Sequence, residues 1–328
     1  MVMSAEKIAI ILPCYNEYEI LPSSCARITG LLKEFVKEGL VSEESTVCFV
    51  DDGSTDDTWR LIKEAAVKDK SVTGISLSRN FGQESALLAA LHEVEADIYV
   101  TIDVDFQDPP EVIREMILKY RSGCGIVYGV RRKRDTDSFF KKYSALFFYN
   151  LMTWLGTGTL KNHSEFRLMG RKAVDAFREY SERDMFLRGI VCGLGFKTGV
   201  VYYDRTARTA GTTKYSCRKM IKLALKAIFS FSVLPLRMIA FAGIVFLFAG
   251  IVILMSGHVI TDPFLSSRLF LGVSALSLGI NLLALGIISE YIGRIMIESK
   301  RRPRFIIGET VGAVSGRRNA MEYGRKAA

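Results

Sequence analysis

Two aspartates, Asp103 and Asp105, stand one residue apart directly after the apolar run 98–102. Side chains at positions i and i+2 of an extended segment point to the same side, so the two carboxylates would lie close together. Carboxylates held this close repel each other unless a cation lies between them. Oxygen ligands suit Mg²⁺ or Mn²⁺, and Mg²⁺ commonly combines one or two carboxylates with substrate phosphates. The pair therefore predicts a site for a metal ion and a diphosphate, and the alternative is a solvated acidic turn before Pro109.

Polar residues also follow three earlier apolar runs, at positions 13–17, 51–56 and 78–83. Any one of these clusters could be ordinary turn or helix-capping chemistry. Together they predict a binding edge, because ligands of parallel α/β sheets collect beyond the carboxyl ends of the strands. The sequence has no Gly-x-x-x-x-Gly-Lys loop and no Gly-x-Gly-x-x-Gly fingerprint. This argues against a P-loop nucleotidase and against a dinucleotide-dependent dehydrogenase.

The elements that would position these clusters alternate along the first part of the chain. Short apolar runs predict strands at residues 7–12, 46–50, 72–77, 98–102 and 125–130. Repeats of 3.6 residues predict helices at residues 19–37, 58–68, 82–94 and 110–121. Strands that are buried on both faces between helices indicate a mostly parallel α/β sheet with flanking helices.

Two uncharged, mainly apolar stretches, 238–255 and 269–289, are each long enough to cross a membrane as a helix. The alternative is a pair of buried core helices. Lys and Arg residues flank both outer ends, whereas the connecting loop 257–268 carries little charge. The positive-inside rule then predicts an integral membrane protein with two spans and with both large ends in the cytoplasm. Residues 1–7 lead into only a short apolar run, so no signal-peptide core is expected.

The 328 residues carry a net charge of +9, which suggests anionic partners such as lipid head groups or phosphorylated substrates. The six cysteines lack paired metal-ligand spacing and the three histidines are scattered, so a zinc site is not expected. Segments 141–155 and 217–234 combine cations with apolar side chains, as helices in a membrane interface do, although the first could equally be a core helix. The predicted organisation is an α/β part (1–134), an acceptor-side part with interfacial helices (135–234), two transmembrane helices (235–299) and a basic cytoplasmic tail (300–328), flexible after Arg304.

Seven short motifs occur in a fixed order along the chain. They are PCYNE at 13–17, VDDGSTD at 50–56, SRNFGQ at 78–83, DVDFQDPP at 103–110, EFRLM at 165–169, RG at 188–189 and RTAGTTKY at 208–215. Each motif is weak alone, but the ordered set resembles family 2 glycosyltransferases with a GT-A fold. The resemblance spans about residues 7–299 and is to the membrane-anchored polyprenyl-phosphate hexosyltransferase type, related to dolichol-phosphate mannose synthase and bactoprenol glucosyltransferases.

This resemblance implies a role for individual residues. The nucleotide sugar would be bound by Pro13, Tyr15, Asn16, Glu17, Asp51, Asp52, Arg79, Gln83 and Asp103. The catalytic residues would be Asp105, Gln107, Glu165 and Arg167, and the metal ligands Asp103 and Asp105. The acceptor phosphate would be bound by Arg131, Arg205, Arg208, Lys214 and Tyr215, although a solvated or lipid-facing role suits the run 131–134 better. Two positions depart from the family pattern: Glu165 replaces the more frequent Asp, and Cys192 replaces a larger side chain.

The implied reaction is a metal-dependent, inverting transfer of a hexose from a nucleotide sugar to a polyprenyl phosphate at the cytoplasmic membrane face. UDP-glucose is the first choice of donor, with UDP-N-acetylglucosamine, UDP-galactose and GDP-mannose open. Undecaprenyl phosphate is the expected acceptor if the source is bacterial, in which case the membrane is the inner one. An acceptor phosphate monoester has a second pKa of about 6, so its attacking oxygen is already mostly ionised and needs no strong base. Related membrane-anchored members suggest a homo-oligomer, and nucleic acid is not an expected partner.

Four alternatives stay open at this point. One is a GDP-mannose-dependent polyprenyl-phosphate mannose synthase. A second is a membrane-bound nucleotidyl- or phosphotransferase, which also needs paired acids and Mg²⁺. A third is a non-catalytic, membrane-tethered nucleotide-sugar-binding protein. The fourth, a processive polysaccharide synthase, fits less well because the chain lacks a Gln-x-x-Arg-Trp motif.

Overall fold

A mixed eight-stranded sheet forms the centre of the α/β domain in the computed structural model, which describes residues 5–132, 163–182, 187–204, 234–255 and 263–313. Its strand order is β7-β5-β6-β4-β1-β2-β3-β8. The strands are β1 (Ile8–Cys14), β2 (Thr46–Asp51), β3 (Val72–Leu77), β4 (Ile98–Thr101), β5 (Ile126–Arg131), β6 (His163–Gly170), β7 (Thr198–Tyr203) and β8 (Ile307–Val311). Strands β4, β1, β2 and β3 run parallel, as do β5 and β7. Strand β6 is antiparallel to β4 and β5, and β8 is antiparallel to β3.

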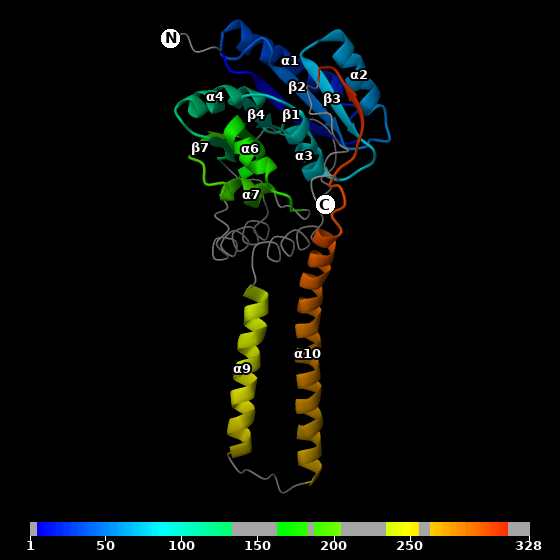
Figure 1. Cartoon of the computed structure of the whole chain (residues 1–328), viewed down its shortest axis with the longest axis vertical. Coiled ribbons are helices and arrows are strands. Elements are labelled where there is room, and N and C mark those ends of the chain that lie inside the picture. The colour runs from blue at the N-terminus through cyan, green and yellow to red at the C-terminus, as the bar shows by residue number, and fades with distance from the viewer. Residues whose placement is uncertain (1–4, 133–162, 183–186, 205–233, 256–262, 314–328) are drawn as a thin grey trace.

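Helices cover both faces of this sheet (Figure 1). One face is packed by α1 (Leu21–Lys37), α2 (Thr58–Lys68) and α4 (Ile113–Arg121), which follows the short helix η1 (Pro110–Val112). The other is packed by α3 (Gln83–Glu93), α6 (Arg171–Arg178) and α7 (Leu187–Gly193). Alternate residues of β1 enter the two cores, Ile10 on one side and Ile11 on the other. This double burial explains why the strand is apolar without interruption.

The five strands and four helices expected from the sequence all form, with ends within two residues of those predicted, except that the helix predicted at 110–121 begins as η1 and is α-helical only from Ile113. The α/β sheet with flanking helices is therefore confirmed, and the sheet as a whole is mixed, with four parallel and three antiparallel pairings between the described strands. One expectation is wrong: residues 307–311, placed in a flexible tail, form strand β8. The pairing has a physical reason, because β3 would otherwise expose a row of unpaired backbone groups at the sheet edge.

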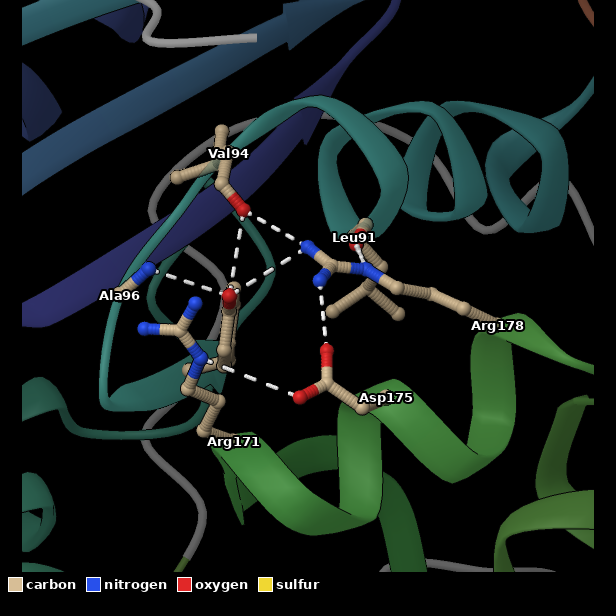
Figure 2. Close-up of polar contacts among 7 residues, drawn as sticks. Leu91, Val94, Ala96, Arg171, Asp175 and Arg178 are labelled. Carbon is tan, nitrogen blue, oxygen red and sulfur yellow. Dashed lines mark hydrogen bonds and ion pairs between the residues drawn. The ribbon is translucent and has the colours of Figure 1, made fainter. Parts of the chain in front are cut away.

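A single arginine joins α6 to the end of α3 (Figure 2). The Arg178 guanidinium donates hydrogen bonds to the carbonyl oxygens of Leu91 (2.7 Å) and Val94 (3.0 Å), and it forms an ion pair with Asp175. The last carbonyl groups of a helix have no partner within the helix. Arg178 therefore caps α3 from a distant element and joins α3 to α6.

Two long helices, α9 (Leu234–Met255) and α10 (Pro263–Ser299), run side by side away from the sheet (Figure 1). Large apolar side chains are exposed along both, for example Phe241 and Leu283. Among the described residues, one stretch, Gly272–Ser299 of α10, passes a test of length and composition for a membrane span. The second span, the topology and the interfacial segments remain predictions; residues 141–155 and 217–233 lie outside the described residues.

Candidate active site

The loops after β1 and β2 form one hydrogen-bonded unit at the carboxyl edge of the sheet. The side-chain oxygen of Asn16 accepts a 2.9 Å hydrogen bond from the N–H of Thr55, while the Asn16 N–H donates to the Ser54 hydroxyl at 2.9 Å. The N–H of Glu17 donates to the Thr58 hydroxyl, also at 2.9 Å. Asn16 adopts a φ of +54°, a left-handed conformation that asparagine tolerates better than most residues. The clusters at 13–17 and 51–56 thus meet as predicted.

Asp51 ends β2 with its side chain buried. Its carboxylate accepts hydrogen bonds from the N–H of Ser54 at 3.1 Å and from the hydroxyl of Ser76 at 2.9 Å. Ser76 lies on the neighbouring strand β3, so Asp51 joins the turn after β2 to the adjacent strand. The carboxylate therefore shapes the edge at which the nucleotide is predicted to bind.

Asp52 performs the same task for the next loop. One carboxylate oxygen accepts the N–H of Phe81 at 2.7 Å and the other accepts the N–H of Gly82 at 2.8 Å. Burial raises the pKa of Asp52 above its usual range, and the two backbone hydrogen bonds offset only part of this rise. Asp52 therefore holds the 78–83 loop at the beginning of α3.

Gly53 is required where the same two loops touch. It adopts a φ of +65°, and a Cβ atom there would lie 2.3 Å from the carbonyl carbon of Arg79. Arg79 itself is exposed at the rim, with its guanidinium 4.0 Å from the ring centroid of Phe81. Tyr15, another predicted donor-binding residue, is exposed and lies just beyond the end of β1. Pro13, also predicted to bind the donor, lies within β1.

The two acids lie in a turn beyond the end of β4. Asp103 and Asp105 are partly exposed, while Val104 between them and Phe106 after them are buried. The side-chain amide of Gln83 donates a 2.7 Å hydrogen bond to Asp103. Asp105 accepts the N–H of Gln107 at 3.3 Å. The structure thus brings the Gln83 and Asp103 motifs together.

Helix α1 contacts this turn through a hydrogen bond. The buried hydroxyl of Ser24 donates a 2.7 Å hydrogen bond to the carbonyl oxygen of Val104. The next residue but one, Phe106, has a φ of +42°, which is uncommon for an aromatic residue. The Arg27 guanidinium lies 5.4 Å from the centroid of the Phe106 ring. Ser24 had no place among the predicted site residues, because nothing in a helical serine reveals a partner 80 residues away.

Arg131 has an internal partner. Its guanidinium makes two 3.1 Å hydrogen bonds to the two oxygens of the buried Asp108 carboxylate. Burial alone would lower the pKa of Arg131, but the charge and hydrogen bond of Asp108, with a smaller contribution from Tyr203, raise it above its usual value. The acceptor-phosphate role implied for Arg131 would have to be compatible with this pair.

Glu165 and Arg167 lie side by side on β6 and form a buried ion pair. The Thr101 hydroxyl on β4 donates a 2.5 Å hydrogen bond to the Glu165 carbonyl oxygen. Arg167 is 2% exposed and lines a cavity beneath α3 and α7 with Leu87 and Val191. The structure therefore places the implied catalytic Arg167 inside the domain, behind the edge that carries Asp103.

The remaining implied acceptor residues, Arg205, Arg208, Lys214 and Tyr215, lie outside the described residues. Within the described part of the chain, no group of three or more His, Cys, Asp or Glu side chains is arranged to hold a metal ion. Asp103 and Asp105 offer two carboxylates, so a bound metal ion would need its other ligands from substrate or water.

Known proteins are similar in sequence to this chain over most of its length. Residues 9–178 match the family described as Glycosyl transferase family 2. The uncharacterized glycosyltransferase YkoT of Bacillus subtilis is 43% identical over 324 residues, which cover 94% of this chain and 93% of the relative. The bactoprenol glucosyl transferase of Shigella phage SfX is 38% identical over 312 residues, 92% of this chain and 98% of the relative. The crystal structure of mannosyl-3-phosphoglycerate synthase from Rubrobacter xylanophilus gives a TM-score of 0.46 at 16% identity, over 68% of this chain and 72% of that one.

The matched residues 9–178 begin in β1 and contain the turn with both acids, the three loops beside it and the Glu165–Arg167 pair. This match and the two relatives together cover the elements that build the edge. The chain belongs to glycosyl transferase family 2 and is a glycosyltransferase.

Proposed function

We propose that this glycosyltransferase transfers a hexose from a nucleotide sugar, with UDP-glucose as the first choice, to a polyprenyl phosphate. The proposal rests on the partly exposed pair Asp103 and Asp105. Gln83 and Ser24 hold the turn that carries this pair, each through a hydrogen bond. The lipid acceptor is supported by the relative named bactoprenol glucosyl transferase, whose length is matched almost completely. The exposed apolar helices α9 and α10 would keep the enzyme at the membrane that holds such a lipid.

A divalent cation, Mg²⁺ or Mn²⁺, would be held by Asp103 and Asp105. Two carboxylates suit such an ion when a diphosphate completes its coordination shell, and the pair lies at the predicted donor edge. When bound, the ion supplies Lewis-acid neutralisation of the charge that builds on the leaving diphosphate. Gln83 would keep Asp103 oriented, because its amide already donates to one carboxylate oxygen.

The rest of the reaction would depend on bringing two anions together. The acceptor phosphate needs little activation, since its second pKa is about 6. Arg205, Arg208 and Lys214 are the cations proposed to receive it, because arginine binds phosphate in a bidentate manner and lysine adds a point charge. Direct attack on the anomeric carbon would invert its configuration. The enzyme would work at the cytoplasmic face as a homo-oligomer anchored by two spans.

The test uses membranes that contain the full-length protein, undecaprenyl phosphate and nucleotide sugars labelled in the hexose. Label that partitions into organic solvent with UDP-glucose supports the proposal, and EDTA should abolish it while Mn²⁺ or Mg²⁺ restores it. Asp103→Asn and Asp105→Asn should each lower the rate by about 10²–10³-fold, the scale of a lost transition-state contact. Glu64→Gln, in the exposed Arg60–Glu64 ion pair on α2, serves as the matched control and should leave the rate unchanged.

The same assay separates the alternatives. Transfer from GDP-mannose alone would identify a mannose synthase. In a parallel reaction with the donor labelled in its β-phosphate, label in the lipid would identify a phosphotransferase, because hexose transfer leaves that phosphate on the nucleotide. Full function with Asp103→Asn would identify a non-catalytic binding protein. Retained anomeric configuration in the product would contradict direct attack.

A further inference from the structure

The chain returns to the α/β domain immediately after α10. Helix α10 ends at Ser299, and Arg301, with a φ of +43°, turns the chain out of the helix just before Pro303. Residues 304–312, which we call the return segment, then run up to the sheet edge beside β3 (Figure 1). Only four residues separate the end of α10 from this segment.

The first part of the return segment is anchored to the layer of α3 and α6. The Arg304 guanidinium donates hydrogen bonds to the carbonyl oxygens of Tyr180 (3.2 Å) and Glu182 (3.0 Å). Phe305 packs against the core on this side, and its ring centroid lies 6.2 Å from that of His92. Burial, together with Arg304 and Arg178, lowers the pKa of His92 to about 4, so the ring that meets Phe305 is neutral at physiological pH.

The second part is anchored to the opposite layer. Glu309 accepts a 2.7 Å hydrogen bond from the Trp59 indole N–H and forms an ion pair with Lys63. Both partners lie on α2. Gly312 closes the segment with a φ of +77°, and a Cβ atom there would lie 2.8 Å from the carbonyl oxygen of Val72. The return segment therefore contacts helices on both faces of the sheet as well as the edge strand.

The return segment contacts the active-site edge through a hydrogen bond between backbone groups. Pairing of β8 with β3 continues past the end of β3, because the N–H of Ser78 donates a 2.9 Å hydrogen bond to the carbonyl oxygen of Ile306. Ser78 begins the 78–83 loop, whose other fixed points are the two hydrogen bonds to Asp52 and the one from Gln83 to Asp103. Without β8, this loop would follow an edge strand, and its first amide would lose its carbonyl partner.

We propose that the return segment is a positioning element for the donor site: it holds the start of the 78–83 loop and thereby the Gln83–Asp103 contact. The consequence for the loop follows from backbone geometry, whereas the consequence for donor binding rests on the proposed function. Helix α10 and the turn that carries Asp103 are then joined by the chain segments 300–306 and 78–83 and by two hydrogen bonds, Ser78 to Ile306 and Gln83 to Asp103. The residues of the return segment act through the loop and touch no substrate.

Two glycines of the same segment provide a matched test. Gly312→Val places a β-branched residue at positive φ against the Val72 backbone and should detach the end of β8 that pairs with Gly74. Arg304→Ala acts at the opposite end of the segment, beside Ile306, where it removes the hydrogen bonds to Tyr180 and Glu182. Gly308→Ala is the control, because its Cβ would meet Ser78 at 3.5 Å, an ordinary contact, without a positive φ. Trp59→Phe gives a milder second variant that keeps the ring and removes only the donor to Glu309. It serves if Gly312→Val does not fold.

The first measurement is hydrogen exchange of the 78–83 amides in the full-length protein. We expect faster exchange at Ser78, Phe81 and Gly82 in Arg304→Ala, a smaller increase in Gly312→Val and Trp59→Phe, which act farther from Ser78, and none in Gly308→Ala. The second is transfer kinetics, in which the KM for the donor should rise about tenfold while the KM for the lipid acceptor stays unchanged.

Faster exchange confined to 304–312, with wild-type exchange in 78–83, would overturn the proposal. An equal rise in both KM values would also overturn it, since it would show that the effect is not specific to the donor site; general destabilisation would instead lower the maximal rate by reducing the amount of folded enzyme. Exchange is measured without the lipid acceptor, so it decides the inference even if the wild-type protein transfers no sugar to a lipid and the proposed function fails.

Discussion

The side-chain amide of Gln83, the first residue of α3, donates a 2.7 Å hydrogen bond to the carboxylate of Asp103, 20 residues further along the chain. An amide N–H aimed at one carboxylate oxygen fixes the rotation of the whole group. The other oxygen then has a defined direction at the sheet edge. Residues that orient a ligand in this way typically matter for activity nearly as much as the ligand itself.

Replacing Gln83 by leucine should lower transfer activity about 10- to 100-fold and raise the Mn²⁺ concentration needed for half-maximal rate. The side chain is exposed, so thermal unfolding should change little. The measurement is a metal titration of the transfer rate for both proteins. An unchanged metal requirement would show that Gln83 does not orient a metal-binding carboxylate.

Gly53→Ala should destabilise the protein by more than about 1 kcal/mol, because it combines an unfavourable φ of +65° with a backbone clash against Arg79. Gly30→Ala is the matched control. Gly30 lies in α1 with open space around its Cβ position, so alanine there should stabilise by about 0.5–1 kcal/mol. Urea unfolding of the two variants should move the midpoint in opposite directions, and a neutral result at Gly53 would contradict the described turn.

Arg131→Met should destabilise the protein by about 3–5 kcal/mol, since it leaves the Asp108 carboxylate buried without its bidentate partner. The double variant Arg131→Met with Asp108→Leu should recover most of this loss. Chemical unfolding measures both, and equal damage in the two would argue against the pair as the cause. If Arg131 also serves the acceptor phosphate, the double variant will regain stability but not acceptor affinity.

The pKa of Asp52 gives a prediction with a definite sign. Because burial raises this pKa in the folded protein, the contribution of Asp52 to stability is complete below its unfolded pKa, about 3.9, and falls as the pH rises through the folded value. Asparagine does not titrate. The difference in melting temperature between wild type and Asp52→Asn should therefore narrow between pH 4 and pH 7. If the difference in melting temperature instead widens with pH, the hydrogen bonds from Phe81 and Gly82 lower the pKa of Asp52 by more than burial raises it.

The alternating pattern of residues 7–130 was sufficient to predict the first five strands and the edge on which the polar clusters meet. Strand β6 was not predicted. Its alternation of Glu165 and Arg167 with Phe166 and Leu168 is typical of a strand with one polar, solvent-facing side. In the structure that side is buried, with Arg167 beneath α3 and α7, and the ion pair compensates the two buried charges. Periodicity alone cannot distinguish a solvated polar face from a paired, buried one.

The position of Asp51 and Asp52 at the sheet edge was easier to predict than their contacts. Asp51 and Asp52 lie at the expected edge, yet their described hydrogen bonds go to serines and backbone amides of neighbouring loops. Such roles depend on which loops the fold brings together. The same holds for Ser24, whose contact with Val104 joins segments 80 residues apart.

Helix α10 is continuous over its 37 residues, and four residues separate its end from the return segment. An α-helix turns by about 100° and advances by about 1.5 Å for each residue. The residue count of α10 therefore sets the rotation of the sheet about the helix axis and the distance of the sheet from the far end of the helix. One residue inserted into α10 would rotate the Asp103 turn by about 100° about the helix axis. Four inserted residues would leave a net rotation of about 40° and would move the turn by about 6 Å along the axis.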